Sequence, residues 1–145
     1  MRRLVLALLV AAIAVAAPVP AVAQQDPCAG ETQTAMNICA ADRVYASFER
    51  LSGLLSELYA SSDSARAAEL RRVQRAWEEY AKRHCEWTVA PNEGGSAQPM
   101  FRDYCLAELA EQRIVALRPL LCGSPMSDCP KARRYPPPAW MSEGP

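Results

Sequence analysis

Apolar residues recur mostly at intervals of three and four along the first long patterned stretch, from about Thr32 to Tyr59. Because an α-helix has about 3.6 residues per turn, this spacing places them on one helical face. These positions are Met36, Cys39, Tyr45, Phe48, Leu51, Leu55, Leu58 and Tyr59. The polar run 61–64 then breaks the pattern and offers oxygen atoms that can cap the next helix. The pattern predicts the first arm of a helical hairpin.

A second helix is predicted from about Ala65 to Glu86. Its expected buried positions are Leu70, Val73, Trp77, Tyr80, Ala81 and Cys85. On another face, Glu78 precedes Lys82 and Glu79 precedes Arg83 at the i, i+4 spacing that suits opposite charges. This face is interpreted as a solvated surface.

A surface loop separates the second helix from the third. The segment 91–96 cannot continue a helix, because it combines a proline with two adjacent glycines. Ser96 is the expected cap of a third helix, and Pro99 is tolerated in its first turn. This helix should end near Leu121 and carry inward Phe101, Cys105, Leu109, Ala116, Leu117 and Leu120. The predicted fold class is therefore all-α, a bundle of about three helices within residues 24–122.

The two ends of the chain have a different character. Residues 1–23 have the layout of a secretory signal peptide: two arginines, an apolar run at 4–17, and small residues before Gln24. The apolar run is short for a bilayer core of about 30 Å, and a lipoprotein pattern before Cys28 is lacking. We therefore expect a periplasmic or secreted protein without a stable membrane anchor. At the other end, residues 123–145 are rich in proline and are predicted to form an extended or disordered tail.

Charge excludes one class of partner. Removal of the signal peptide takes away Arg2 and Arg3 and leaves 14 basic against 16 acidic residues. A nucleic-acid-binding surface needs an excess of basic side chains. We therefore expect no nucleic-acid partner.

Six cysteines remain after the signal peptide, and an even number in an exported protein indicates a disulfide framework. They are Cys28, Cys39, Cys85, Cys105, Cys122 and Cys129. The first four are expected at the end of the bundle opposite the first turn. Pairing Cys28 with Cys39 is disfavoured because Cys39 is expected well inside a helix, whereas bridged Cα atoms must lie close together. The pairing Cys39–Cys85 with Cys28–Cys105 is therefore favoured. The pairing Cys39–Cys105 with Cys28–Cys85 stays open as the alternative.

The last two cysteines, Cys122 and Cys129, are separated by a turn-rich stretch and are expected to form a local clip. Zinc ligation by His84 and the cysteines is disfavoured, because the close pairs of ligands typical of structural zinc sites are absent. No metal or other cofactor is expected.

Catalytic signatures are equally absent from the sequence. There is no nucleophile elbow, phosphate-binding glycine loop or zinc-protease motif, and the single histidine, His84, lies beside a cysteine. The helical carboxylates of Asp42, Glu49 and Glu57 suggest solvent contact. Trp77 and Tyr80 are expected in the core, whereas Trp87 and Trp140 are expected to be exposed.

Four motifs occur in an order and spacing that resemble a known family. They are TQTAMNICA at 32–40, QRAWEEYAKRHC at 74–85, GGSAQPM at 94–100 and CLAELAEQR at 105–113. The chain resembles the LprI-type lysozyme inhibitors over about residues 28–120. It departs from the family pattern at polar positions. This chain has Ser52 and Ser56 where the family has an acid and an amide, and Ala110 where the family usually has a threonine.

The resemblance implies an envelope-located, cysteine-bridged binding protein with a protein partner, a lysozyme, and no enzymatic activity of its own. The expected contact residues are Gly94, Gly95 and Ser96 in the loop, with Trp87 beside them. One alternative is an envelope interaction or assembly protein that binds through its proline-rich tail, Tyr135 to Trp140. A hydrolase is a third, weaker hypothesis, and the oligomeric state is not predicted.

Overall fold

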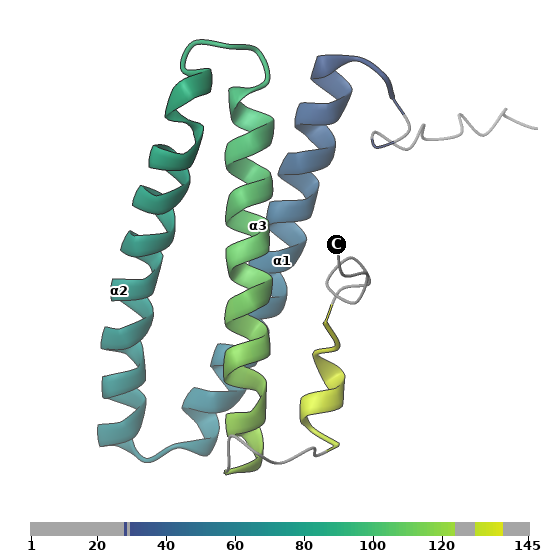
Figure 1. Cartoon of the computed structure of the whole chain (residues 1–145). Coiled ribbons are helices and arrows are strands. Elements are labelled where there is room, and N and C mark those ends of the chain that lie inside the picture. Colours follow the sequence, from purple (N-terminus) through teal and green to yellow (C-terminus); the bar gives the residue numbers. More distant parts are fainter. Residues whose placement is uncertain (1–27, 29, 124–129, 138–145) are drawn as a thin grey trace, which may run out of the picture.

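The computed structural model describes residue 28 and residues 30–123 and 130–137. Three long helices make up most of this part, α1 (Gln33–Ser61), α2 (Ser64–Val89) and α3 (Gln98–Leu117). The short 3-10 helix η2 (Ala90–Asn92) directly follows α2, and η3 (Arg118–Cys122) directly follows α3. A further short 3-10 helix, η4 (Ala132–Arg134), lies later in the chain. The predicted all-α class is confirmed (Figure 1). The predicted signal peptide, residues 1–23, lies outside the described residues.

Side-chain caps start two of the helices. The Thr32 hydroxyl accepts the backbone N–H of Ala35 at 3.2 Å, and the Asp63 carboxylate accepts that of Arg66 at 2.8 Å. The predicted break and cap between the first two helices are thus confirmed. The prediction that Ser96 caps α3 is wrong, because Ala97 is the cap residue and makes no side-chain cap bond. Pro99 does lie in the first turn of that helix.

The third helix lies between the other two over the upper half of the bundle in Figure 1. It packs chiefly against α1 and less extensively against α2, while α1 and α2 meet mainly near their connecting turn. The main core is therefore built by α1, α3 and η3. It consists of Leu51, Leu54, Leu55, Leu58, Ala110, Ile114, Leu117 and Leu121.

This arrangement corrects the predicted inner face of α2. Its buried residues are Ala67, Gln74, Ala81, Cys85 and Val89. Val73 and Tyr80, predicted to be buried, are 44% and 53% exposed. Because α1 packs along α3 instead of along α2, the flank of α2 that carries these two side chains is left uncovered. Tyr45 and Phe101 were likewise expected to face the core but are exposed.

Part of the tail that was predicted to be mostly extended or disordered, residues 130–137, packs on the bundle. Ala132 is buried, and the phenol of Tyr135 donates a hydrogen bond of 2.8 Å to Glu57 on α1. The backbone oxygen of Tyr135 accepts from Arg118, and that of Pro136 accepts from Arg50. We call residues 130–137 the docked tail segment. Its prolines lack backbone N–H donors, but the contacts above use a side chain and carbonyl oxygens, which proline does not remove. Trp140 and residues 138–145 lie outside the described residues.

The favoured cysteine pairing and its alternative are both wrong. Cys28 is bonded to Cys39 with Cα atoms 4.9 Å apart, and Cys85 to Cys105 with Cα atoms 5.7 Å apart. Side chains in a helix tilt toward its N-terminus, so the Cys39 side chain points toward the segment before α1 that carries Cys28. Since α3 separates α1 from α2 at this end, Cys85 meets α3 instead of α1.

The predicted location of these four sulfurs is confirmed, because the bonded residues lie near the start of α1, the end of α2 and the start of α3. Cys122 is also disulfide-bonded, but its predicted partner Cys129 lies outside the described residues. Among the helices of the described ranges, none is both long and apolar enough to cross a membrane.

Candidate functional site

The connection between α2 and α3 has a defined conformation although its residues 90–96 are exposed. The N–H of Gly95 donates to the Asn92 carbonyl at 3.0 Å, and the N–H of Gln98 donates to the Gly95 carbonyl at 3.1 Å. The Gln98 side chain reaches back and accepts the N–H of Gly94 at 3.0 Å. Gly94 has a φ of 75°, a left-handed conformation that glycine adopts without steric cost. The loop is therefore held by its own turns.

The same loop is tied to all three helices. The Cys85–Cys105 disulfide joins the end of α2 to the start of α3 on either side of it. From α1, the Asn37 amide donates to the backbone oxygen of Ser96 at 3.1 Å. Asn37 is itself held by the Gln33 amide at 2.9 Å. The loop is a preorganised surface.

Exposed aromatic side chains extend from this loop along α2. Trp87 is 78% exposed, which confirms its prediction, and Tyr80 is exposed on the same flank. The ring of His84 lies between them in sequence, with its centroid 5.4 Å from that of Tyr80. We call Tyr80, His84 and Trp87 the aromatic ridge. Sequence reasoning missed Tyr80, and its three- and four-residue spacing to His84 and Trp87 was the available signal.

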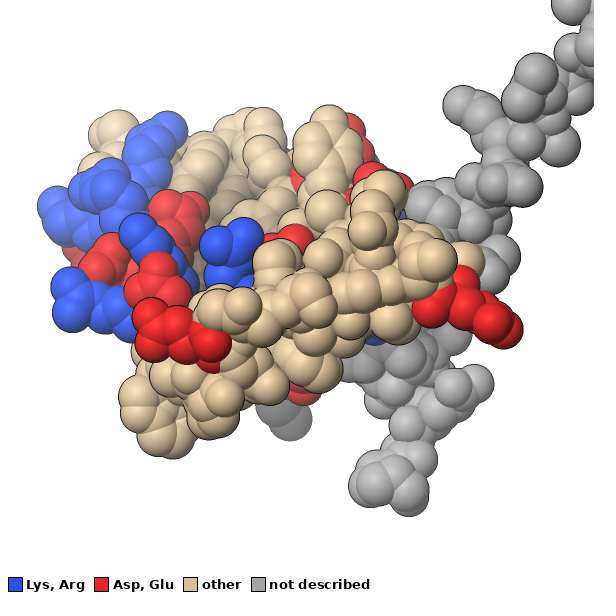
Figure 2. All heavy atoms as spheres, turned by 90° about the horizontal axis from the view of Figure 1, so that it is seen from above, with Lys and Arg blue, Asp and Glu red and all other residues tan. Residues whose placement is uncertain are grey.

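Another face of α2 is charged and exposed, as predicted. The Arg83 guanidinium binds the Glu79 carboxylate at 2.5 Å. This hydrogen bond and the charge of Arg83 lower the pKa of Glu79, and the same contact raises the pKa of Arg83. Glu78 accepts instead from the Gln74 amide at 3.2 Å. Viewed from the loop end, the basic side chains gather on the α2 side, while the middle of this end is largely uncharged (Figure 2).

Two motifs that suggested the family meet inside the bundle. The Arg113 guanidinium donates to the Gln74 amide oxygen at 3.3 Å, and it lies 5.8 Å from the centre of the Trp77 ring. Burial lowers the pKa of Arg113. The Gln–Trp part of the motif at 74–85 and the Glu–Gln–Arg part of the motif at 105–113 thus hold α2 against α3. They maintain the scaffold, and the exposed loop and ridge are left as the candidate surface for a partner.

The cysteines beside His84 in the described residues are not available as metal ligands. The sulfurs of Cys85 and Cys105 are bonded to each other, which removes them as partners for His84 in zinc binding. In the described parts of the chain, no group of three or more metal-ligating side chains comes together.

Comparison with known proteins places this architecture in a family. The family model described as lysozyme inhibitor LprI matches residues 24–117, a range that contains all three helices and the loop. This chain belongs to the LprI lysozyme inhibitor family. The LprI match thereby confirms the resemblance drawn from the four motifs.

A relative adds little about activity. The chain is 40% identical over 52 residues to an uncharacterised protein of Rhizobium meliloti (strain 1021). That alignment covers 36% of this chain and 37% of the relative. No solved structure matches this LprI-family chain.

Proposed function

We propose that this protein is an exported inhibitor that binds a lysozyme without covalent chemistry and blocks it sterically. The match to the LprI family over residues 24–117 carries this proposal. The proposed location is the periplasm or the exterior of the cell, after loss of residues 1–23. An oxidising compartment suits the disulfides, which persist there and are rare in the cytosol.

The proposed contact surface is the α2–α3 loop with the adjoining aromatic ridge. Its central residues are Gly94, Gly95, Ser96 and Trp87. A loop already held by hydrogen bonds and a disulfide loses little conformational entropy on binding. Exposed tryptophan and tyrosine supply large contact area and dominate many protein interfaces. A preorganised loop beside exposed aromatic side chains suits binding at an enzyme cleft.

Binding through the proline-rich tail is less well supported. Tyr135 is partly buried against the core and is hydrogen-bonded to Glu57. A free binding arm would need this aromatic side chain to be available. The docked tail segment therefore supports a structural role for the first part of the tail.

The decisive test is a cell-wall lysis assay with the purified, oxidised protein titrated against c-type and then other lysozymes. We expect dose-dependent protection that is lost on reduction. Trp87→Ala should weaken protection by about tenfold or more without changing the unfolding midpoint. Tyr45→Ala is the matched control, because Tyr45 is an exposed aromatic on α1. Absence of protection against every lysozyme would refute the function, whereas equal losses in both variants would refute the contact surface.

A further inference from the structure

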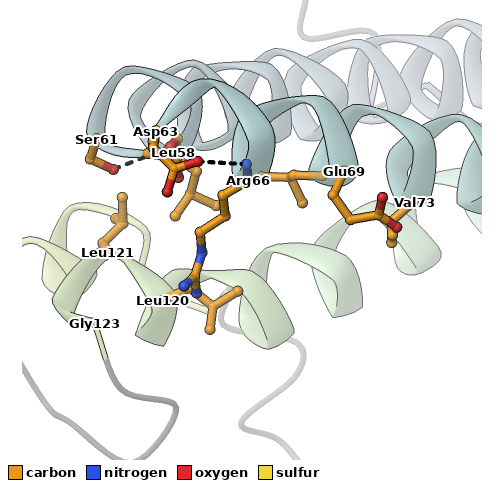
Figure 3. A pocket seen from close by; sticks show the side chains of 11 residues that line it. Leu58, Ser61, Asp63, Arg66, Glu69, Val73, Leu120, Leu121 and Gly123 are labelled. Atoms are coloured by element: carbon orange, nitrogen blue, oxygen red, sulfur yellow. Dashed lines mark hydrogen bonds between the residues drawn. The ribbon is translucent and has the colours of Figure 1, made fainter.

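A cavity of about 530 Å³ lies at the opposite end of the bundle from the α2–α3 loop. It is formed where the α1–α2 turn and the first half of α2 face η3 (Figure 3). Small-molecule sites in proteins measure about 300 to 1,000 Å³. The lining residues discussed below lie in the described part of the chain. The cavity is therefore large enough for a ligand of moderate size.

Aliphatic side chains from all three segments supply the apolar lining. They are Leu58, Leu70, Val73, Leu120 and Leu121. Leu58 and Leu121 are core residues, so the cavity reaches the main core of the protein. Val73 remains 44% exposed beside them, because nothing in the described structure covers this flank of α2. A ligand with a hydrocarbon body would remove this apolar surface from water.

Most polar side chains around the cavity are already engaged within the protein. The hydroxyls of Ser61 and Ser62 both donate to the backbone oxygen of Leu58, at 3.2 and 2.8 Å. The carboxylate of Asp63 caps α2. Glu69 forms an ion pair with Arg72. These groups have less capacity to recognise a polar ligand.

Arg66 differs from them. Its side chain extends from α2 toward Leu120 and lies across the cavity in Figure 3. Its guanidinium has no ion pair or hydrogen bond within the described residues, although its backbone N–H is bound by Asp63. A guanidinium is always charged and binds carboxylates and phosphates through two parallel hydrogen bonds. Within the described residues, the cavity thus combines hydrocarbon walls with a guanidinium that has no partner.

We propose that this cavity binds an anionic single-chain amphiphile, with its hydrocarbon chain against the aliphatic lining and its head group on Arg66. A fatty acid and a lysophospholipid both present this chemistry, the first as a carboxylate and the second as a phosphate. The site is separate from the proposed lysozyme-binding surface and does not depend on that function. A lysozyme assay is accordingly not its readout.

The test is a titration of the purified, oxidised protein, labelled with ¹³C at the methyl groups of leucine and valine, followed by NMR. The probes are dodecanoate, dodecyl phosphate and uncharged dodecyl maltoside, each below its micelle-forming concentration. We expect saturable shifts confined to the methyl groups of the five aliphatic lining residues. The two anions should bind about tenfold more tightly than the maltoside. Their relative affinities distinguish a carboxylate ligand from a phosphate ligand.

Three variants isolate the two parts of the site. Arg66→Gln should weaken both anions by about tenfold and leave the maltoside unchanged. Arg75→Gln, an exposed arginine on α2 outside the cavity, is the control and should change nothing. Val73→Glu, at a half-exposed position that tolerates a polar side chain, should abolish binding while the unfolding midpoint stays the same.

Several results would overturn the proposal. Absence of saturable methyl shifts with every probe would exclude the cavity as a site. Equal weakening in Arg66→Gln and Arg75→Gln would exclude specific recognition of the head group. Methyl shifts that follow protein concentration without any probe would show that a second copy of the chain occupies the cavity instead.

Discussion

The guanidinium of Arg50 on α1 donates a hydrogen bond of 2.8 Å to the carboxylate of Glu111 on α3. Glu111 is only 2% exposed, whereas about a third of the Arg50 side chain is accessible. The same guanidinium also donates to the backbone oxygen of Pro136. One side chain therefore holds two helices and the docked tail segment together.

Replacement of Arg50 should destabilise the fold. Arg50→Met leaves the Glu111 carboxylate buried without its cation, and we expect a loss of about 2 kcal/mol in the free energy of unfolding. Urea unfolding followed by circular dichroism measures this loss. The double variant Arg50→Met/Glu111→Met removes both charges and should recover most of it. A single variant within about 0.5 kcal/mol of the parent protein would contradict the role assigned to this pair.

Two glycines should respond in opposite directions to alanine. Gly94→Ala forces a side chain into a left-handed conformation, which costs about 1 kcal/mol, and should also weaken lysozyme inhibition by distorting the loop. Gly53→Ala lies inside α1, where the added Cβ meets the Tyr135 hydroxyl at an acceptable 3.5 Å. It should stabilise the protein by about 0.5 kcal/mol without affecting inhibition. Thermal unfolding and the lysis assay together check both, and a stabilising Gly94→Ala would refute the loop conformation.

The docked tail segment should make stability depend on alkaline pH. Burial and the hydrogen bond to Glu57 raise the pKa of the Tyr135 phenol above its ordinary value of 10.0. Above about pH 10 the unfolded chain loses this proton before the folded chain does, so the folded state binds more protons and loses stability as pH rises. The stabilising contribution of Tyr135 is fully present below about pH 10 and is lost as the pH rises through the pKa of Tyr135 in the folded state.

Tyr135→Phe removes this titration. Its free energy of unfolding should therefore fall less than that of the parent protein between about pH 9 and pH 11. Tyr45→Phe, at a tyrosine that is 71% exposed, is the control and should follow the parent. Identical pH profiles for Tyr135→Phe and the parent protein would show that the tail segment is not docked in solution.

The two described disulfides should differ in their effects. Replacing Cys85 and Cys105 by alanine opens a crosslink between residues 20 apart, which should cost about 3 kcal/mol and release the α2–α3 loop. Replacing Cys28 and Cys39 opens an 11-residue separation near the start of α1 and should cost less. Inhibition should be lost in the first variant and kept in the second. Unfolding midpoints and the lysis assay measure the difference, and equal inhibition in both would show that the loop needs no crosslink.

Helices and the loop were predictable from local sequence, because periodicity and the paired glycines act over a few residues. Which helices pack against one another was not predictable in this way. Periodicity does not say which helix covers which flank, so Trp77 and Tyr80, only three residues apart, were both assigned to the core although Tyr80 is exposed. The cysteine pairing was predicted wrongly for the same reason, because the prediction placed α1 directly beside α2.

Buried polar residues were the second class that local sequence could not reveal. Gln74 and Glu111 look like surface residues until their partners Arg113 and Arg50 are known. Burial of such groups is acceptable only when hydrogen bonds compensate for lost water, and these partners lie on other helices. The docking of Tyr135 was missed for the same reason, because its partner Glu57 is 78 residues away in the chain.

The separation of the two described disulfides also bears on exchange between molecules. Cys28–Cys39 lies within the first part of the chain, and Cys85–Cys105 joins α2 to α3, so neither bond links α1 to the rest of the bundle. A turn of two residues, Ser62 and Asp63, connects α1 to α2. An exchange of α1 between two molecules would therefore require reduction of neither described bond. Domain swapping of this kind would yield a dimer that displays two α2–α3 loops.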